Sequence, residues 1–179
     1  YRKRVANVHD GSLILSIDLA HAIAGYAAKR TQEVFGFGAP TGSVEWRDFF
    51  DEVHVRRRVL EAERDRFYIL STLETLRVPP NYACEAVDLD SRSGDFRSHY
   101  AGYIDPGWGY GKDGEGRGRT ITLEVRSNER RLCFRHGQPL SRFRFERMSE
   151  VPEVHYDRLE SSNYRAQSGP RLSKHFKTD

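Results

Sequence analysis

Glu124 is the residue whose setting in the sequence first suggests chemistry. It lies in residues 119–127, where Ile121, Leu123 and Val125 alternate with polar residues. Such alternation predicts a strand with one buried face and one polar face, and the glutamate falls on the polar face. A carboxylate there is a candidate general base if a pocket surrounds it, and an ordinary solvated side chain if none does. The strand pattern alone leaves both interpretations open.

The loop before this strand, GWGYGKDGEGRG at residues 107–118, is rich in glycine. It lacks the spacing and the Lys-Ser/Thr ending of a phosphate-binding P-loop, so a flexible hairpin connection is the simpler interpretation. A zinc deaminase needs His-x-Glu followed by Pro-Cys-x-x-Cys, and none of the seven histidines begins such a motif. Cys84 and Cys133 are far apart in the chain. We therefore predict two unbridged thiols and no bound zinc.

Short strands separated by turn residues surround this candidate site. One stretch, residues 44–66, has Phe49, Phe50 and Val53 spaced for a helical face, so part of it is predicted to be a short helix, or else a charged excursion between strands. Many short strands at close spacing indicate an all-β sandwich, barrel or jelly roll. The strands are expected within residues 11–19, 26–37, 67–79, 82–89, 96–104, 119–127 and 131–148.

Composition limits the class of protein. The chain has 179 residues, of which 37% are hydrophobic and 31% charged, so a single domain over residues 1–179 is expected. The net charge of +3 is too small to indicate nucleic-acid binding. No run approaches the roughly 18 apolar residues of a membrane span. We predict a soluble, cytoplasmic protein with neither a membrane nor a nucleic acid as partner.

The tail from residue 153 onward is either frayed or an ordered arm that closes over an anionic ligand. Tyr156, Tyr164 and Phe176 would anchor such an arm. Its positive charges are Arg165, Arg171, Lys174 and Lys177.

Several segments in order resemble the dCTP deaminases of the dUTPase-like group. AGYIDPGW followed by TITLEV resembles the Ile-Asp-Pro-Gly-aromatic turn and the Leu-Glu strand of that family. Further segments are similar to family motifs, namely SIDL at 16–19, FYILSTLETLRVPPNYAC at 67–84, RHGQPLSRFRFERM at 135–148 and the tail from Tyr156. The resemblance implies a dUTPase-like distorted jelly-roll or β-clip barrel with a short helical segment and a C-terminal arm, residues 153–179.

The resemblance also implies a reaction and a set of site residues. The reaction is hydrolytic deamination of dCTP to dUTP and ammonia, with Glu124 as general base in a pocket shared with Asp105. Mg²⁺ would be bound through the substrate triphosphate, and a homotrimer or a pseudo-trimer of duplicated chains is expected. The substrate-binding residues carried over are Ala101, Tyr103, Asp105, Thr122, Leu123, Tyr156, Asn163 and Gln167.

Two departures keep alternatives open. The family's Arg-Ser-Ser-x-x-Arg motif is missing from DLDSRSGDFRS at residues 88–98, and Asn163 replaces a tail lysine. The chain is most similar to the second half of a long, duplicated dCTP deaminase, so we expect a fragment of a longer chain that acts with a partner half. The alternatives are a non-catalytic half, a dUTPase-type pyrophosphatase, and a β-sheet RNA-binding module with Tyr100, Tyr103, Phe143 and Phe145 as its stacking platform.

Overall fold

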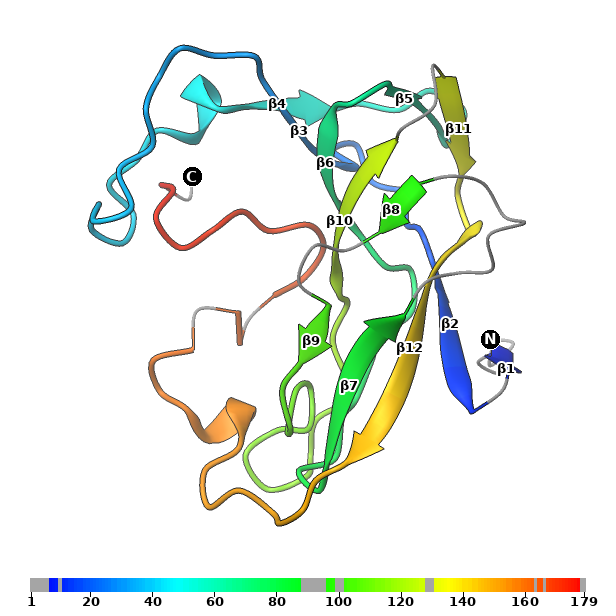
Figure 1. The fold of residues 1–179 in the computed structure, drawn as a ribbon, viewed down its shortest axis with the longest axis vertical. Coiled ribbons are helices and arrows are strands. Elements are labelled where there is room, and N and C mark those ends of the chain that lie inside the picture. Colours follow the sequence, from blue (N-terminus) through cyan, green and yellow to red (C-terminus); the bar gives the residue numbers. More distant parts are fainter. Residues whose placement is uncertain are drawn as a thin grey trace.

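The fold was examined in a computed structural model, which describes residues 7–9, 11–87, 96–98, 102–127, 131–162, 164–165 and 167–177. In this part of the chain the strands form two five-stranded antiparallel sheets and one two-stranded sheet (Figure 1). The first sheet has the order β1-β2-β12-β7-β9 and the second has the order β4-β3-β6-β10-β8. The all-β class expected from the sequence is confirmed.

The strand bounds are as follows. The first sheet consists of β1 (Asn7–His9), β2 (Ser12–Ser16), β12 (Pro139–Arg147), β7 (Tyr82–Val87) and β9 (Tyr103–Ile104). The second consists of β4 (Phe50–Val53), β3 (Gly25–Ala28), β6 (Phe67–Ser71), β10 (Thr122–Ser127) and β8 (Phe96–Ser98). The small sheet pairs β11 (Arg131–Arg135) with β5 (Val59–Glu63).

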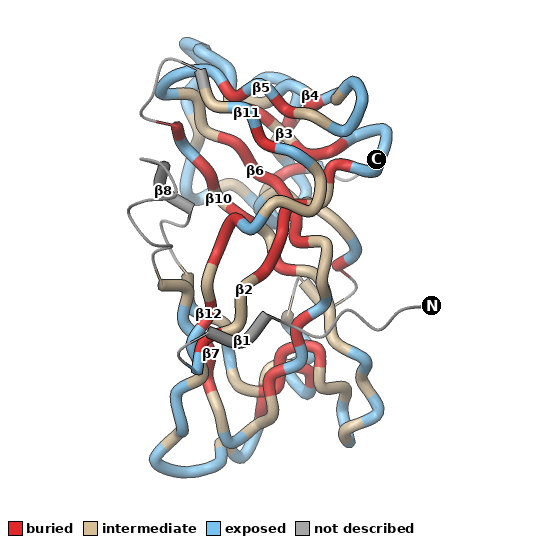
Figure 2. The backbone as a smooth tube through the Cα atoms, turned by 90° about the vertical axis from the view of Figure 1, so that its right-hand side faces the viewer, coloured by how far each residue is buried: buried red, intermediate tan, exposed pale blue. Residues whose placement is uncertain are grey.

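The hydrophobic core follows the alternation predicted for β10. Leu123 and Val125 are fully buried, whereas Thr122 and Glu124 are partly exposed on the opposite face. Leu70 on β6 lies opposite Leu123 and is also fully buried. Figure 2 shows these buried stretches running along β6 and β10. Burying one face of the strand fixes its register, because a slip of one residue would expose every apolar side chain.

The short helical segment expected within residues 44–66 is present, but it is shorter than the spacing of Phe49, Phe50 and Val53 suggested. The chain forms only a three-residue 3-10 turn at Trp46–Asp48 and then enters β4 and β5. Trp46 is buried with its ring edge-on to Tyr26 on β3, at 5.3 Å between centroids, so tertiary packing overrides the helical spacing. Between the two strands Arg57 and Arg58 adopt positive φ angles of 53° and 58°, which forces a turn.

Two strand predictions were too long, and others held. The strand expected over residues 26–37 ends at Ala28, and the second half of residues 67–79 forms only a bridge between Leu76 and Arg119. The two strands around His136-Gly137 are present as β11 and β12, but they join different sheets. Cys84 and Cys133 are free, as predicted, and burial raises the pKa of the Cys84 thiol to about 12.

The glycine-rich loop and the tail complete the fold. The loop over 107–118 joins β9 in the first sheet to β10 in the second, so it is not the connection of a hairpin. The tail is an ordered arm that contains a 3-10 turn at Tyr156–Arg158 and rises beside β9 toward β4, coloured orange to red in Figure 1. Near its end Phe176 bridges Val44. In the described part of the chain, no helix is long and apolar enough to cross a membrane.

Candidate active site

Glu124 lies beside a cavity of about 310 Å³ on the outer face of the second sheet. Its strand position is opposite Ile69 on β6, which lines the same cavity. The apolar part of the wall is formed by Phe50, Ile69, Ile104, Trp108, Ile121 and Phe176. The polar part is formed by Tyr103, Thr122, Glu124, Tyr164, Gln167, Arg171 and Ser173. A hollow that combines apolar walls with placed polar groups is typical of a small-molecule site.

The arm forms one side of this cavity and is bonded directly to the strand that carries Glu124. The Gln167 side-chain amide donates to the Thr122 hydroxyl at 2.6 Å, and the Gly169 amide donates to the Thr120 hydroxyl at 3.2 Å. Further along, the Phe176 ring packs against Phe50 of β4, at 5.6 Å between centroids. The arm is therefore held at two places, one on each side of the cavity.

A buried ion pair fixes the root of the arm. Both guanidinium nitrogens of Arg119 donate to the Asp157 carboxylate, at 2.6 Å and 2.9 Å, and the Gly111 amide donates to the same group at 2.7 Å. The Asp157 residue is only 2% exposed. The glycine-rich loop is thus tied to the arm and is not a free connection. A two-pronged pair of this kind constrains orientation as well as distance.

The Asp-Pro-Gly turn packs against the same root. The Tyr156 amide donates to the Pro106 carbonyl at 2.8 Å. Gly107 has a φ of 86°, and a Cβ at this position would overlap the His155 ring, so only glycine fits. The next residue, Trp108, packs against Tyr156 with the rings tilted by 53° and 5.0 Å between their centroids, and it forms part of the cavity wall. The turn therefore places an aromatic wall next to the strand of Glu124.

Desolvation acts on two groups next to the cavity. Asp105 keeps a solvent-exposed surface, yet the surrounding protein desolvates its carboxyl enough to raise the pKa, and a hydrogen bond from its own backbone amide opposes this rise. Desolvation also raises the pKa of Tyr156, and the nearby Asp105 charge adds to that rise. Both shifts favour the protonated form of the group.

The structure brings four of the predicted site residues to one cavity, namely Tyr103, Thr122, Glu124 and Gln167. Asp105 lies on the turn and Tyr156 on the arm root, and neither is among the lining residues. Contrary to the prediction, Glu124 and Asp105 therefore do not line one cavity, and Asp105 lies next to it instead. Leu123 points its side chain into the core, which leaves only its backbone for the predicted role. Ala101, Asn163 and the stretch 88–95 lie outside the described residues.

Sequence reasoning did not assign nine of the thirteen residues that line the cavity, among them Trp108, Tyr164, Arg171 and Phe176. Trp108 could have been found, because it directly follows the Asp-Pro-Gly turn. Tyr164, Arg171 and Phe176 were visible only as arm aromatics and charges, since nothing local in the sequence tells which side of an arm faces the sheet.

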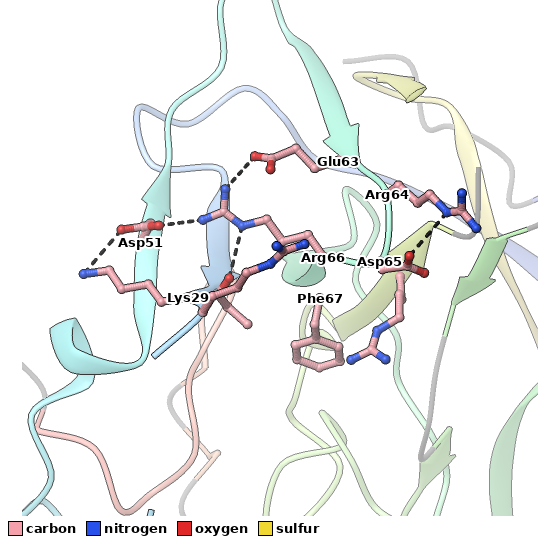
Figure 3. A pocket seen from close by; sticks show the side chains of 10 residues that line it. Lys29, Asp51, Glu63, Arg64, Asp65, Arg66 and Phe67 are labelled. Atoms are coloured by element: carbon pink, nitrogen blue, oxygen red, sulfur yellow. Dashed lines mark hydrogen bonds and ion pairs between the residues drawn. The ribbon is translucent and has the colours of Figure 1, made fainter. Parts of the chain in front are cut away.

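A larger hollow of about 500 Å³ lies at the end of the same sheet, where β3 ends and β6 begins (Figure 3). Its lining is rich in charge: Lys29, Arg30, Asp51, Glu63, Arg64, Asp65, Arg66 and Arg126. Arg66 lies between Glu63 and Asp51 and donates to them at 2.7 Å and 2.5 Å, and it also donates to the Ala28 carbonyl at 3.1 Å. The positive charge of Arg66 is therefore largely neutralised by Glu63 and Asp51.

Comparison with known proteins shows the family. Residues 2–176 match the model described as 2'-deoxycytidine 5'-triphosphate deaminase, C-terminal domain, and the chain belongs to this family. Among solved structures it is similar to 2'-deoxycytidine 5'-triphosphate deaminase from Agrobacterium tumefaciens, with 35% identity and a TM-score of 0.68. That similarity covers 84% of this chain and 44% of the other, so the chain spans less than half of its length. A comparison with curated proteins returned no match. The resemblance read from the sequence, and with it the dUTPase-like fold, is confirmed.

Proposed function

We propose that the chain takes part in the hydrolytic deamination of dCTP to dUTP and ammonia, in the cavity beside Glu124. The observation that carries the proposal is the placement of this carboxylate. Among the described residues that line the cavity, Glu124 alone has a carboxyl group. It faces apolar walls in a chain of the dCTP deaminase family. An acid in such a setting can act as a general base on a bound pyrimidine.

In the proposed reaction, Glu124 accepts a proton from a water molecule as the water oxygen bonds to C4 of cytosine. That proton passes to N3, which takes up the electron pair of the C4=N3 bond. The hydroxyl proton of the tetrahedral carbon then moves through Glu124 to the amino group, so that the C4–N bond breaks, ammonia leaves and a C4 carbonyl forms. The carboxylate ends the cycle unchanged. Backbone groups of Thr122 and Leu123, the two residues before Glu124 on β10, would face the pyrimidine edge, as the family resemblance implies.

Two further parts of the proposal concern metal and assembly. Mg²⁺ would arrive on the triphosphate, held by phosphate oxygens and water. This matches a cavity whose described lining offers a single carboxylate and no other carboxyl partner. We also propose a homotrimer or a pseudo-trimer of duplicated chains. Tyr103 is 57% exposed at the cavity and is available to contact a second chain there.

The principal alternative is a non-catalytic half that completes a site with another half. It is favoured by the match to a C-terminal domain and by the 44% coverage of the Agrobacterium tumefaciens chain. The other two alternatives have less support. A dUTPase-type pyrophosphatase would use an aspartate, whereas the cavity presents a glutamate. An RNA-stacking platform would need Phe143, which is fully buried; Tyr100 lies outside the described residues.

The test is ammonia release from dCTP by the wild-type protein and by Glu124→Gln. Glutamine keeps the shape of the side chain but cannot accept the proton of water, so turnover should fall by about 10²-fold or more while dCTP still binds. Unchanged turnover in this variant would exclude Glu124 as the base. The wild-type protein can also be mixed with a full-length family member whose own general base is changed from Glu to Gln. If the wild-type protein alone binds dCTP but releases no ammonia, and the mixture does release it, the chain is catalytic but depends on a partner, and the non-catalytic alternative is wrong.

A further inference from the structure

Arg171 is the cation of the Glu124 cavity. Among the described lining residues it is the one with a positive charge, and it is partly exposed there. Within the described part of the chain it makes no hydrogen bond or ion pair, and its guanidinium carbon lies 5.8 Å from the centre of the Tyr164 ring. A cation on an aromatic face beside an apolar cavity lacks a counter-ion, and an anionic ligand would supply one.

The arm sets the position of Arg171 from both sides. On one side, Gln167 and Gly169 bond to threonines that lead into and begin β10. On the other, the Phe176 ring packs against Phe50, and the Val44 amide donates to the His175 carbonyl at 3.0 Å. Arg171 follows Pro170 between these two attachments, and proline limits the freedom of the backbone there. The backbone that carries Arg171 is therefore held beside the cavity by the fold.

The larger hollow shows what a different arrangement of cations looks like. There Arg66 donates to two carboxylates and a carbonyl, Lys29 donates to the Arg47 carbonyl at 2.6 Å, and Arg64 lies 3.3 Å from Asp65. Those three cations have partners within the protein. Arg30 also lines the larger hollow without a hydrogen bond or ion pair to a described residue, but it lies among other charges, whereas Arg171 is the one cation beside the apolar walls of the Glu124 cavity. An anion entering the Glu124 cavity would meet a cation that is free to bind it.

We infer that Arg171 binds the phosphate groups of the nucleotide and so makes the site select a nucleotide over the corresponding nucleoside. This inference rests on the proposed function and adds a residue to it. The guanidinium has a planar set of donors that matches phosphate oxygens in two-pronged bonds. Arg171 and Glu124 are the two charged residues of the described lining, and of the two only Arg171 carries the charge that attracts a phosphate.

The experiment measures the affinities of dCTP and deoxycytidine by calorimetry for four proteins: wild type, Arg171→Gln, Arg171→Lys and Lys174→Gln. Lys174 is a matched control, because it is an exposed cation of the same arm that does not line the cavity. Arg171→Gln should weaken dCTP binding by about 10-fold or more, the scale of losing a charge-assisted hydrogen bond. Deoxycytidine binding should change by less than about 2-fold, and Arg171→Lys should recover part of the dCTP affinity.

Each other outcome is decisive. Equal losses for dCTP and deoxycytidine would mean that the substitution disturbs the arm, and the inference would be wrong. The same holds if neither ligand is affected, if Lys174→Gln matches Arg171→Gln, or if wild-type protein binds no dCTP. Binding of dCTP that depends on Arg171 without ammonia release would leave the inference standing and contradict the proposed reaction, so the two can fail separately. Thermal unfolding of all four proteins checks that the fold is retained.

Discussion

Two hollows lie on the same sheet, and they are built in opposite ways. The larger one, about 500 Å³, is lined by eight charged residues, among which Arg66 pairs with Glu63 and Asp51. The smaller one, about 310 Å³, has aromatic and aliphatic walls, and its described lining has two charged residues, Glu124 and Arg171. Volume and charge alone would point to the larger hollow. The charged groups of the larger hollow mostly have partners within the protein, and a charge that is already paired binds a ligand less strongly. The smaller hollow is therefore the better candidate site.

The strands do not account for this difference. Glu124 and Arg126 are two residues apart on β10, so they lie on the same face, and their partners Ile69 and Phe67 on β6 do as well. The two hollows differ in the segments that cover this face of the sheet. The arm lays Tyr164, Gln167 and Phe176 over the Glu124 end. At the other end the turn between β5 and β6 supplies Arg64, Asp65 and Arg66. One sheet face is thus turned into two environments by segments outside the sheet.

The most damaging change to the smaller cavity should be Asp157→Asn, which removes the charge that fixes the arm root. Arg119 would then keep its charge in a largely buried place without a counter-ion, and the free energy of unfolding should fall by about 3 kcal/mol. Affinity for dCTP should fall too, because the arm forms part of the wall. Urea denaturation and calorimetry measure the two effects.

The control for this prediction is Asp113→Asn. Asp113 accepts from Arg158 at 2.9 Å between the same loop and the same arm, but its side chain is 82% exposed. An exposed pair contributes about 0–1 kcal/mol, so this variant should stay close to wild type. If Asp113→Asn and Asp157→Asn have equal effects, burial of the Arg119–Asp157 pair is not what holds the arm.

Arg66→Met tests the larger hollow and should have a smaller effect. It removes the hydrogen bonds to Glu63, Asp51 and Ala28 but keeps an unbranched apolar stem. Because both carboxylates remain largely in contact with water, we expect a loss of about 1–2 kcal/mol in unfolding free energy. Turnover of dCTP and its affinity should not change. A variant with normal stability and reduced turnover would place the larger hollow in the chemistry and reverse the comparison.

The sequence predicted those parts of the fold that local patterns determine. β10 was found from its alternation, because a strand with one buried face must repeat every second residue. The Asp105-Pro106-Gly107 turn was found from its resemblance to a family motif. By contrast, the spacing of Phe49, Phe50 and Val53 suits a helix, yet β4 pairs with β3 and no helix forms over these residues. That pairing joins residues far apart in the chain, so the spacing of residues within 44–66 could not predict it.

The site was predictable to a similar limit. Glu124 and Gln167 were named from motifs, and both line the cavity. The ion pair between Arg119 and Asp157 joins two ordinary charged residues 38 positions apart, and nothing near either one marks it as buried. The role of Arg171 likewise depends on which side of the arm faces the sheet. Side chains that reach the site only through tertiary packing could not be predicted from the sequence.

Asp105 provides the mildest test, because it marks the edge of the smaller cavity without lining it. Its pKa is raised in the folded protein by desolvation, so folding favours the protonated carboxyl. The folded state therefore binds more protons than the unfolded state at pH values between the ordinary and the raised pKa. Across that interval the contribution of Asp105 to stability declines as pH rises. Asp105→Asn removes the titrating group and should remove this decline.

Urea denaturation of wild type and Asp105→Asn at several pH values between about 4 and 7 measures the difference. The stability of Asp105→Asn relative to wild type should rise with pH through the lower part of that range and then stay level. Curves that remain parallel at every pH would show that the Asp105 carboxyl titrates normally and is fully solvated. The cavity would then end at Trp108, and the Asp-Pro-Gly turn would serve only to orient that ring. A measured rise would instead show that the Asp-Pro-Gly turn beside the Glu124 cavity is desolvated. This end of the sheet would then differ further from the other end, where the charges around Arg66 are solvated.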